Sequence, residues 1–222
     1  MNYFALFAAV AIGYIVAIFL KKRGILEMPI FLAFSGAFLL SVTIFEMLPE
    51  VFENPSKQIG LYIMCGILLQ IVLDFFSNGA EHGHVHMDSE SKGFPWLLLI
   101  SLSIHALLEG FPVTDNSIML IGVIVHKIPI AIILSLFFFN ANYGKLTSLS
   151  FLFLFALMTP LGSLLSTKVT ILNEHETAIN AVAIGVFLHV STTILFESSK
   201  DHKFNLAKLV AIVLGIGIAY FI

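Results

Sequence analysis

The sequence predicts an all-α membrane protein with eight transmembrane helices. Hydrophobic residues make up 59% of the 222 residues and charged residues only 11%, whereas soluble domains average about 45–50% and about 25%. The apolar residues fall into eight runs, each close to the roughly 20 residues that a membrane-spanning helix needs. Basic residues gather in every second loop between these runs. The lipid bilayer is therefore the expected solvent of the chain.

The eight spans are separated by polar and helix-breaking residues. The first span is interpreted as a retained helix rather than a signal peptide, because its basic residues follow the apolar run instead of preceding it. Long apolar runs without an alternating polar face favour helices over barrel strands. The spans are predicted at residues 3–20, 28–48, 59–77, 95–112, 116–138, 146–166, 177–197 and 205–222.

The distribution of lysine and arginine predicts the orientation, because cytoplasmic loops carry an excess of these residues. The loops after spans 1, 3, 5 and 7 hold eight basic residues, whereas the other set, with both termini, holds only Lys57 and Lys168. Both termini are therefore expected outside and loop 78–93 in the cytoplasm. Short loops favour a bacterial inner (cell) membrane. The eight residues are Lys21, Lys22, Arg23, Lys92, Lys145, Lys200, Lys203 and Lys208.

A sequence similarity between two spans suggests an inverted repeat within a single domain of residues 1–222. Span 2 contains Gly36-Ala37-Phe38-Leu39 with Thr43 after it, and span 7 contains Gly185-Val186-Phe187-Leu188 with Thr192 after it. These two spans run in opposite directions. This pattern predicts a 3+2+3 arrangement in which spans 1–3 are mirrored by spans 6–8, although chance similarity in a chain rich in Phe and Leu is the alternative.

Ionisable groups inside apolar spans are costly and usually functional, and three of those in this chain lie in two adjacent spans. His105 and Glu109 share one face of span 4, and His126 lies in span 5. A rise of about 1.5 Å per residue places both histidines roughly 15 Å deep, near the midplane of a hydrocarbon core about 30 Å thick. Spans 4 and 5 are joined by a very short link. The three side chains are therefore expected to converge.

Two imidazoles and a carboxylate are a typical donor set for Zn²⁺, with Fe²⁺, Mn²⁺, Co²⁺, Ni²⁺ or Cd²⁺ as alternatives. The simpler interpretation is that each histidine only bonds a backbone carbonyl or a serine. Lys127 follows His126 directly. It is expected to fill the space of a second metal and to pair with a carboxylate of another span. No organic cofactor and no nucleic-acid partner are expected, because the net charge is −3 and the one basic cluster is short.

Four motifs resemble the ZIP (Zrt/Irt-like protein) family of metal transporters. His105-Ala106-Leu107-Leu108-Glu109-Gly110 resembles the H-x-x-x-E-G signature of the family's fourth helix, and His126-Lys127-Ile128-Pro129 is similar to its fifth-helix pattern. Met47-Leu48-Pro49-Glu50 looks like the end of its second helix, and Thr159-Pro160-Leu161-Gly162 looks like its sixth-helix motif. The resemblance spans most of the chain.

The resemblance implies uptake of Zn²⁺ or a similar metal toward the cytoplasm, with His105, Glu109 and His126 as ligands of the principal site. The chain departs from the family pattern at Glu46, Ala106 and Ile130, where many relatives carry other residues. Together with Lys127, these departures imply one metal rather than a two-metal centre. Alternating access of the midplane site to the two membrane faces is the expected mechanism.

Further polar residues outline a transport path. Glu46 and Glu50 share a face at the outer end of span 2 and would concentrate cations, with plain solvation as the alternative. Gln70 and Asp74 share a face near the inner end of span 3, where an exit role competes with an interfacial one. His189 in span 7 lies at a similar depth as the site, either as a ligand or relay or as a core histidine.

The loop between spans 3 and 4 alternates histidine with other residues. His82, His84 and His86 would bind divalent metal weakly, or the segment is an ordinary polar loop. Metal ions, the bilayer and, as an open alternative, a second copy of the chain in a homodimer are the expected partners. Two other functional classes compete with transport: an intramembrane zinc-dependent hydrolase and a metal-sensing receptor that relies on this loop.

Overall fold

The structure is a computed structural model, and it is almost entirely helical in the residues that it describes, which exclude 1–2, 24–27, 78–93, 114–116, 142 and 198–205. In this part of the chain, seven helical segments are long and apolar enough to cross a membrane. They are α1 (Tyr3–Arg23), α2 with η1 and α3 (Met28–Val42, Thr43–Met47 and Leu48–Val51), α4 (Lys57–Ser77), α5 with η3 (Trp96–Gly110 and Phe111–Val113), α6 (Ser117–Asn140), α7 (Lys145–Lys168) and α9 (Glu176–Glu197).

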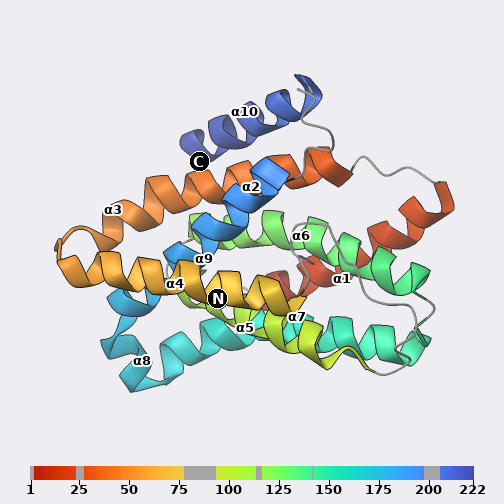
Figure 1. The fold of residues 1–222 in the computed structure, drawn as a ribbon, viewed down its shortest axis with the longest axis horizontal. Helices are drawn as coiled ribbons and strands as arrows, with labels where there is room; N and C mark the ends of the chain where they lie inside the picture. The colour runs from red at the N-terminus through yellow and green to blue at the C-terminus, as the bar shows by residue number, and fades with distance from the viewer. Residues whose placement is uncertain (1–2, 24–27, 78–93, 114–116, 142, 198–205) are drawn as a thin grey trace.

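The eighth predicted span is the apolar helix α10 (Leu206–Phe221), which has 16 residues and is shorter than the other seven. It packs along α2 at one edge of the bundle (Figure 1). The all-α membrane fold predicted from the sequence is thus confirmed. The short helix α8 (Thr170–Glu174) was not predicted, because its five residues lie in a polar connection and bury no side chain.

The helices pair as an inverted repeat requires. Helix α4 packs along α9 and α2 along α10, while α1 packs along α6 and α5 along α7. An inverted repeat would relate α1, α2 and α4 to α7, α9 and α10, and α5 to α6. Under this exchange, the pair of α4 and α9 becomes the pair of α10 and α2. In the same way, the pair of α1 and α6 becomes the pair of α7 and α5. The order of contacts therefore follows the predicted 3+2+3 arrangement.

Glycines set how closely two of these pairs approach. A side chain at Gly66 of α4 would overlap the carbonyl oxygen of Val182 in α9. In the second pair, a side chain at Gly110 of α5 would overlap the carbonyl oxygen of Thr159 in α7. Small residues of this kind let helix backbones meet directly inside a membrane. Because Gly110 follows Glu109, this contact brings α7 next to the Glu109 carboxylate.

The second span contains a π-helical turn, η1, before its last turn α3. The backbone N–H of Leu48 donates to the carbonyl of Thr43, one residue further back than in an α-helix. Pro49 follows and lacks a backbone N–H. We call the end of the bundle that holds α3 and α8 the outer end (left in Figure 1) and the opposite end the inner end.

Candidate metal centre

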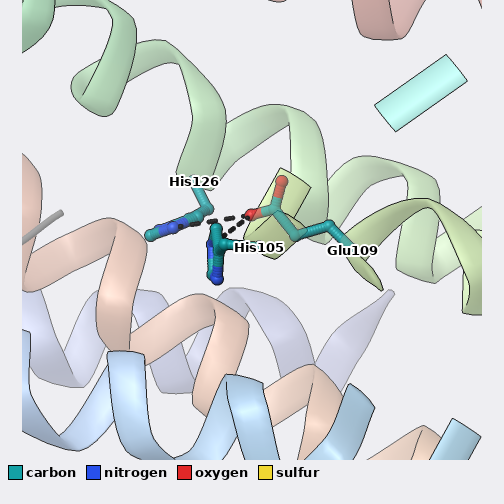
Figure 2. Close-up of side chains that lie close together, drawn as sticks. All are labelled: His105, Glu109 and His126. Carbon is teal, nitrogen blue, oxygen red and sulfur yellow. Dashed lines mark hydrogen bonds and ion pairs between the residues drawn. The ribbon is translucent and has the colours of Figure 1, made fainter. Parts of the chain in front are cut away.

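Two adjacent helices bring His105, Glu109 and His126 together in the interior. Helix α5 carries His105 and Glu109 one turn apart, and α6 carries His126. The three residues are only 3%, 1% and 1% exposed. Figure 2 shows the three side chains close together, with dashed lines from both imidazole rings to the same oxygen of the Glu109 carboxylate. The structure therefore brings together the three residues that the sequence predicts as ligands.

The separations suit a single metal ion. The Nε2 atoms of His105 and His126 lie 3.1 Å and 3.7 Å from Oε1 of Glu109. One potential ligand atom from each of the three residues lies within 4.8 Å of the others. Two ligands at about 2.0–2.1 Å from a tetrahedral zinc ion are about 3.3 Å apart. Small side-chain shifts would thus place all three atoms on one ion.

The site continues toward the inner end as a chain of polar contacts. Nδ1 of His105 lies 3.0 Å from Oε1 of Gln70 in α4, and Nε2 of Gln70 donates to Oδ1 of Asp74 at 3.0 Å. The other carboxylate oxygen of Asp74 lies 3.2 Å from Nδ1 of His189 in α9. We call the five residues from Glu109 to His189 the polar chain. It includes Gln70, Asp74 and His189, all expected along a path, although their roles in transport remain predictions.

Two oxygen atoms lie next to the two ring nitrogens of His105. Because Gln70 donates from Nε2 to Asp74, its Oε1 faces the ring and accepts from Nδ1 of His105. The other ring nitrogen faces a carboxylate oxygen of Glu109. Two oxygens therefore flank the ring. A metal ion bound between Nε2 and the carboxylate would need the tautomer with a proton on Nδ1, and the bond to Gln70 favours that tautomer.

Lys127 lies beside the site and pairs with the second oxygen of Glu109. Its Nζ donates to Oε2 at 2.6 Å and lies 4.6 Å from the ring centre of Phe155. The hydroxyl of Thr159 approaches the same carboxylate oxygen at 3.5 Å. The expected pairing of Lys127 with a carboxylate of another span is therefore found. One oxygen of Glu109 faces the histidines and the other faces the ammonium.

A separate cavity of about 230 Å³ opens at the outer end, and we call it the outer cavity. Glu50 at the end of α3 lines it, whereas Glu46 in η1 is half-buried and is not among its lining residues. The outer cavity lies between the ends of α3, η3, α6 and α9. Its lining residues are Met47, Glu50, Val51, Pro112, Ser117, Ile118, Met119, Glu176 and Asn180.

Several contacts of the site were not predicted from the sequence. Gln70 was expected on the path but not as the partner of His105, and Glu176 and Asn180 were not singled out. The i, i+4 spacing of Glu176 and Asn180 at the start of an otherwise apolar span is a signal for them. Thr159 was visible only as part of a motif. The predicted loop ligands His82, His84 and His86 lie outside the described residues.

Comparison with known proteins shows what the chain is similar to. The family model of the ZIP zinc transporters matches residues 78–222, which is more than half of the chain. The chain is also similar to protein zntD of Dictyostelium discoideum, with 28% identity over 163 residues. That match covers 62% of this chain but only 24% of zntD. The chain thus spans about a quarter of the length of the curated relative that it matches.

Proposed function

This chain belongs to the ZIP zinc transporter family, and we propose that it carries zinc or a related divalent metal ion across the membrane toward the cytoplasm. The observation that carries the proposal is the buried group of His105, Glu109 and His126, whose ligand atoms lie within reach of one ion. The chain is a multi-pass membrane protein, and the three residues are buried in the interior of its helix bundle. Buried ionisable groups of this kind mark ion pathways.

The donor set selects the class of substrate. Two imidazole nitrogens and one carboxylate oxygen suit Zn²⁺, and they also accept Fe²⁺, Mn²⁺, Co²⁺, Ni²⁺ or Cd²⁺. Hard ions such as Mg²⁺ and Ca²⁺ prefer sites made of oxygen ligands alone. We therefore expect the site to discriminate transition metals from the abundant hard cations.

Lys127 gives the site a property suited to transport rather than storage. With no metal, its ammonium balances the buried Glu109 carboxylate at 2.6 Å. A metal ion bound by His105, His126 and Oε1 of Glu109 would then add positive charge close to a fixed ammonium. Like charges at this range repel by about 1 kcal/mol or more. Lys127 would thus weaken metal binding and speed release, in the space where a second ion would otherwise bind.

We propose that the site opens alternately toward the two ends of the bundle. The polar chain supplies oxygen and nitrogen ligands in the inner direction, and Asp74 near the end of α4 would release the ion toward loop 78–93. The pairing of helices as an inverted repeat supports movement of one bundle against the other. Both termini would then lie outside, at the cell membrane, and residues 1–222 would act as a single domain without an organic cofactor. A homodimer stays a prediction.

The intramembrane hydrolase is not retained as an alternative. The family to which the chain belongs is one of transporters rather than enzymes. In addition, Lys127 beside Glu109 would oppose the use of this carboxylate as the general base for a metal-bound water. A receptor function would depend on the histidines of loop 78–93, which lie outside the described residues.

Zinc uptake into proteoliposomes tests the proposal. The full chain is reconstituted with a zinc gradient, and accumulation of radioactive zinc is compared in the wild type, His105→Ala and His126→Ala. We expect flux in the wild type and its loss in both variants. His175→Ala is the matched control, because His175 is exposed at the outer end and its side chain contacts only the carbonyl of Ile171, at 2.9 Å, in the described structure.

The outcomes separate the parts of the proposal. Absence of zinc flux in the wild type would overturn the transport function. Wild-type flux that persists in both histidine variants would overturn the assignment of the site while leaving transport intact. Equal losses in His175→Ala and His105→Ala would show a general effect of removing histidine.

A further inference from the structure

We infer that the outer cavity is a second cation site, which holds a divalent metal ion with its water shell still in place before the ion reaches the buried histidines. The inference rests on the proposed function and adds a second cation site to the transport path. Two carboxylates from different spans, Glu50 of α3 and Glu176 of α9, line the cavity. Neither Glu176 nor its neighbour on the same face, Asn180, belongs to the motifs found in the sequence.

Asn180 indicates that the cavity has polar contents. This residue is only 8% exposed, and its side chain has no hydrogen-bond partner among the residues that the structure describes. It lines the outer cavity one helical turn after Glu176. Because Asn180 lines the outer cavity, its amide can form hydrogen bonds with what the cavity contains. Water, free or bound to an ion, is the group that fits there.

The size and chemistry of the cavity favour a hydrated ion over a bare one. A volume of about 230 Å³ accommodates about seven to eight water molecules at about 30 Å³ each, which is enough for a divalent ion with six waters. The polar side chains that line it in the described residues are Glu50, Ser117, Glu176 and Asn180. All of them offer oxygen atoms, and none is an imidazole or thiolate. Such a set binds the water shell of a cation rather than replacing it.

On α6, a layer of apolar residues lies between this cavity and the buried site. Met119, Val123 and His126 follow one another along one face of α6. Met119 lines the outer cavity, His126 belongs to the buried site, and both Met119 and Val123 are completely buried. An ion with its waters cannot cross this layer without losing them. The outer cavity is thus the place where the ion is concentrated before dehydration.

Binding of hexaamminecobalt(III) tests this inference directly. The six ammonia ligands of this complex do not exchange, so it imitates a hydrated metal ion and cannot be coordinated by His105 or His126. The full chain in lipid nanodiscs is equilibrated with the complex by dialysis, and bound cobalt is measured. We expect saturable binding that Mg²⁺ displaces as well as Zn²⁺ does, because both ions carry water shells.

Three variants and one matched control locate the bound complex. Glu176→Gln removes one lining carboxylate and should weaken binding about tenfold, and Asn180→Leu should weaken it as well. Glu174→Gln is the matched control, because Glu174 is exposed two residues earlier but does not line the cavity. His105→Ala should leave binding of the complex unchanged. Zinc binding at the buried site, measured by chelator competition, shows that each cavity variant is folded.

The inference is overturned if the wild type does not bind the complex, if Glu174→Gln and Glu176→Gln weaken binding equally, or if His105→Ala abolishes it. A wild type that binds the complex but moves no zinc would refute the proposed function and support the cavity site. A wild type that moves zinc without binding the complex would refute the cavity site alone.

Discussion

The two directions that lead away from Glu109 differ in chemistry. Toward the inner end, His105, Gln70 and Asp74 follow one another at hydrogen-bond distance, and the side chains of Asp74 and His189 are 15% and 20% exposed. Toward the outer end, completely buried apolar residues of α6 separate the site from the outer cavity. An ion would therefore find ligands on one side of the site and a dehydrating barrier on the other. We interpret this state as closed toward the outer end.

The largest effect is expected from removing the carboxylate of Glu109, which lies between the inner polar chain and the outer apolar layer. Glu109→Gln takes away a ligand and leaves the ammonium of Lys127, which is 1% exposed, without its charged partner. We expect loss of zinc flux and a decrease in stability of about 3–5 kcal/mol, the usual cost of breaking a buried ion pair. Flux into proteoliposomes and thermal unfolding in detergent measure the two losses.

The double variant Glu109→Gln/Lys127→Met separates these two roles. It removes both charges, so most of the stability should return, whereas the missing ligand should keep flux absent. Recovery of flux together with stability would contradict the assignment of Glu109 as a ligand. Failure of stability to recover would contradict the ion pair as the source of the loss.

A smaller effect is expected in the inner direction. Gln70→Leu removes the acceptor that orients the His105 ring at 3.0 Å. Loss of such a supporting bond typically weakens metal binding by about 10–100-fold. Competition with a chromophoric chelator measures the affinity. Ser77→Ala is the control on the same helix, because Ser77 is buried but bonds only the backbone carbonyl of Asp74 in the described structure. An unchanged zinc affinity in Gln70→Leu would show that the polar chain does not support the metal site.

The charge beside the site should act in the opposite sense. Lys127→Gln removes an ammonium close to the bound ion, so we expect zinc to bind about tenfold more tightly and to leave more slowly. Stopped-flow transfer of zinc to a chelator measures the release rate, and zinc should raise the unfolding temperature of this variant more than that of the wild type. Weaker binding in Lys127→Gln would show that the lysine supports the metal site instead of opposing it.

The smallest expected effect lies in the outer direction. Val123→Thr keeps the shape of the side chain but adds a hydroxyl to the apolar layer, which costs stability by about 1–3 kcal/mol. If dehydration across this layer limits uptake, the hydroxyl should raise zinc flux by a small factor. Val125→Thr is the matched control, since Val125 is half-buried and lies on another face of α6. Equal effects of Val123→Thr and Val125→Thr on zinc flux would show that the apolar layer does not act as the dehydration barrier.

The secondary structure was largely predictable because the bilayer restricts the choices. Apolar runs must form helices with satisfied backbones, and the structure has helices at all eight predicted positions, although α10 is short. The turn η1 and the helix α8 were not predicted. Both are local adjustments of five residues, and apolar composition carries no information on the hydrogen-bond register within a span.

The candidate site was predictable in part for a similar reason. His105, Glu109 and His126 were identified because ionisable residues in two adjacent, antiparallel spans must avoid the lipid and therefore face one another. The bond from His105 to Gln70 was not predicted, because it depends on which face of α4 meets α5. The same limit applies to Glu176, which lines the outer cavity, while the equally acidic Glu174 does not.

By itself, the sequence determined that this chain lies in a membrane as a set of helices and that two histidines and a glutamate are buried among them. Hydrophobicity and spacing are sufficient for that, because the cost of a polar group in lipid acts on every residue alone. Only the tertiary structure decided which oxygen of Glu109 faces Lys127, that polar contacts continue toward the inner end, and that an apolar layer interrupts them toward the outer end. Those features depend on the rotation and close approach of neighbouring helices, and packing sets both.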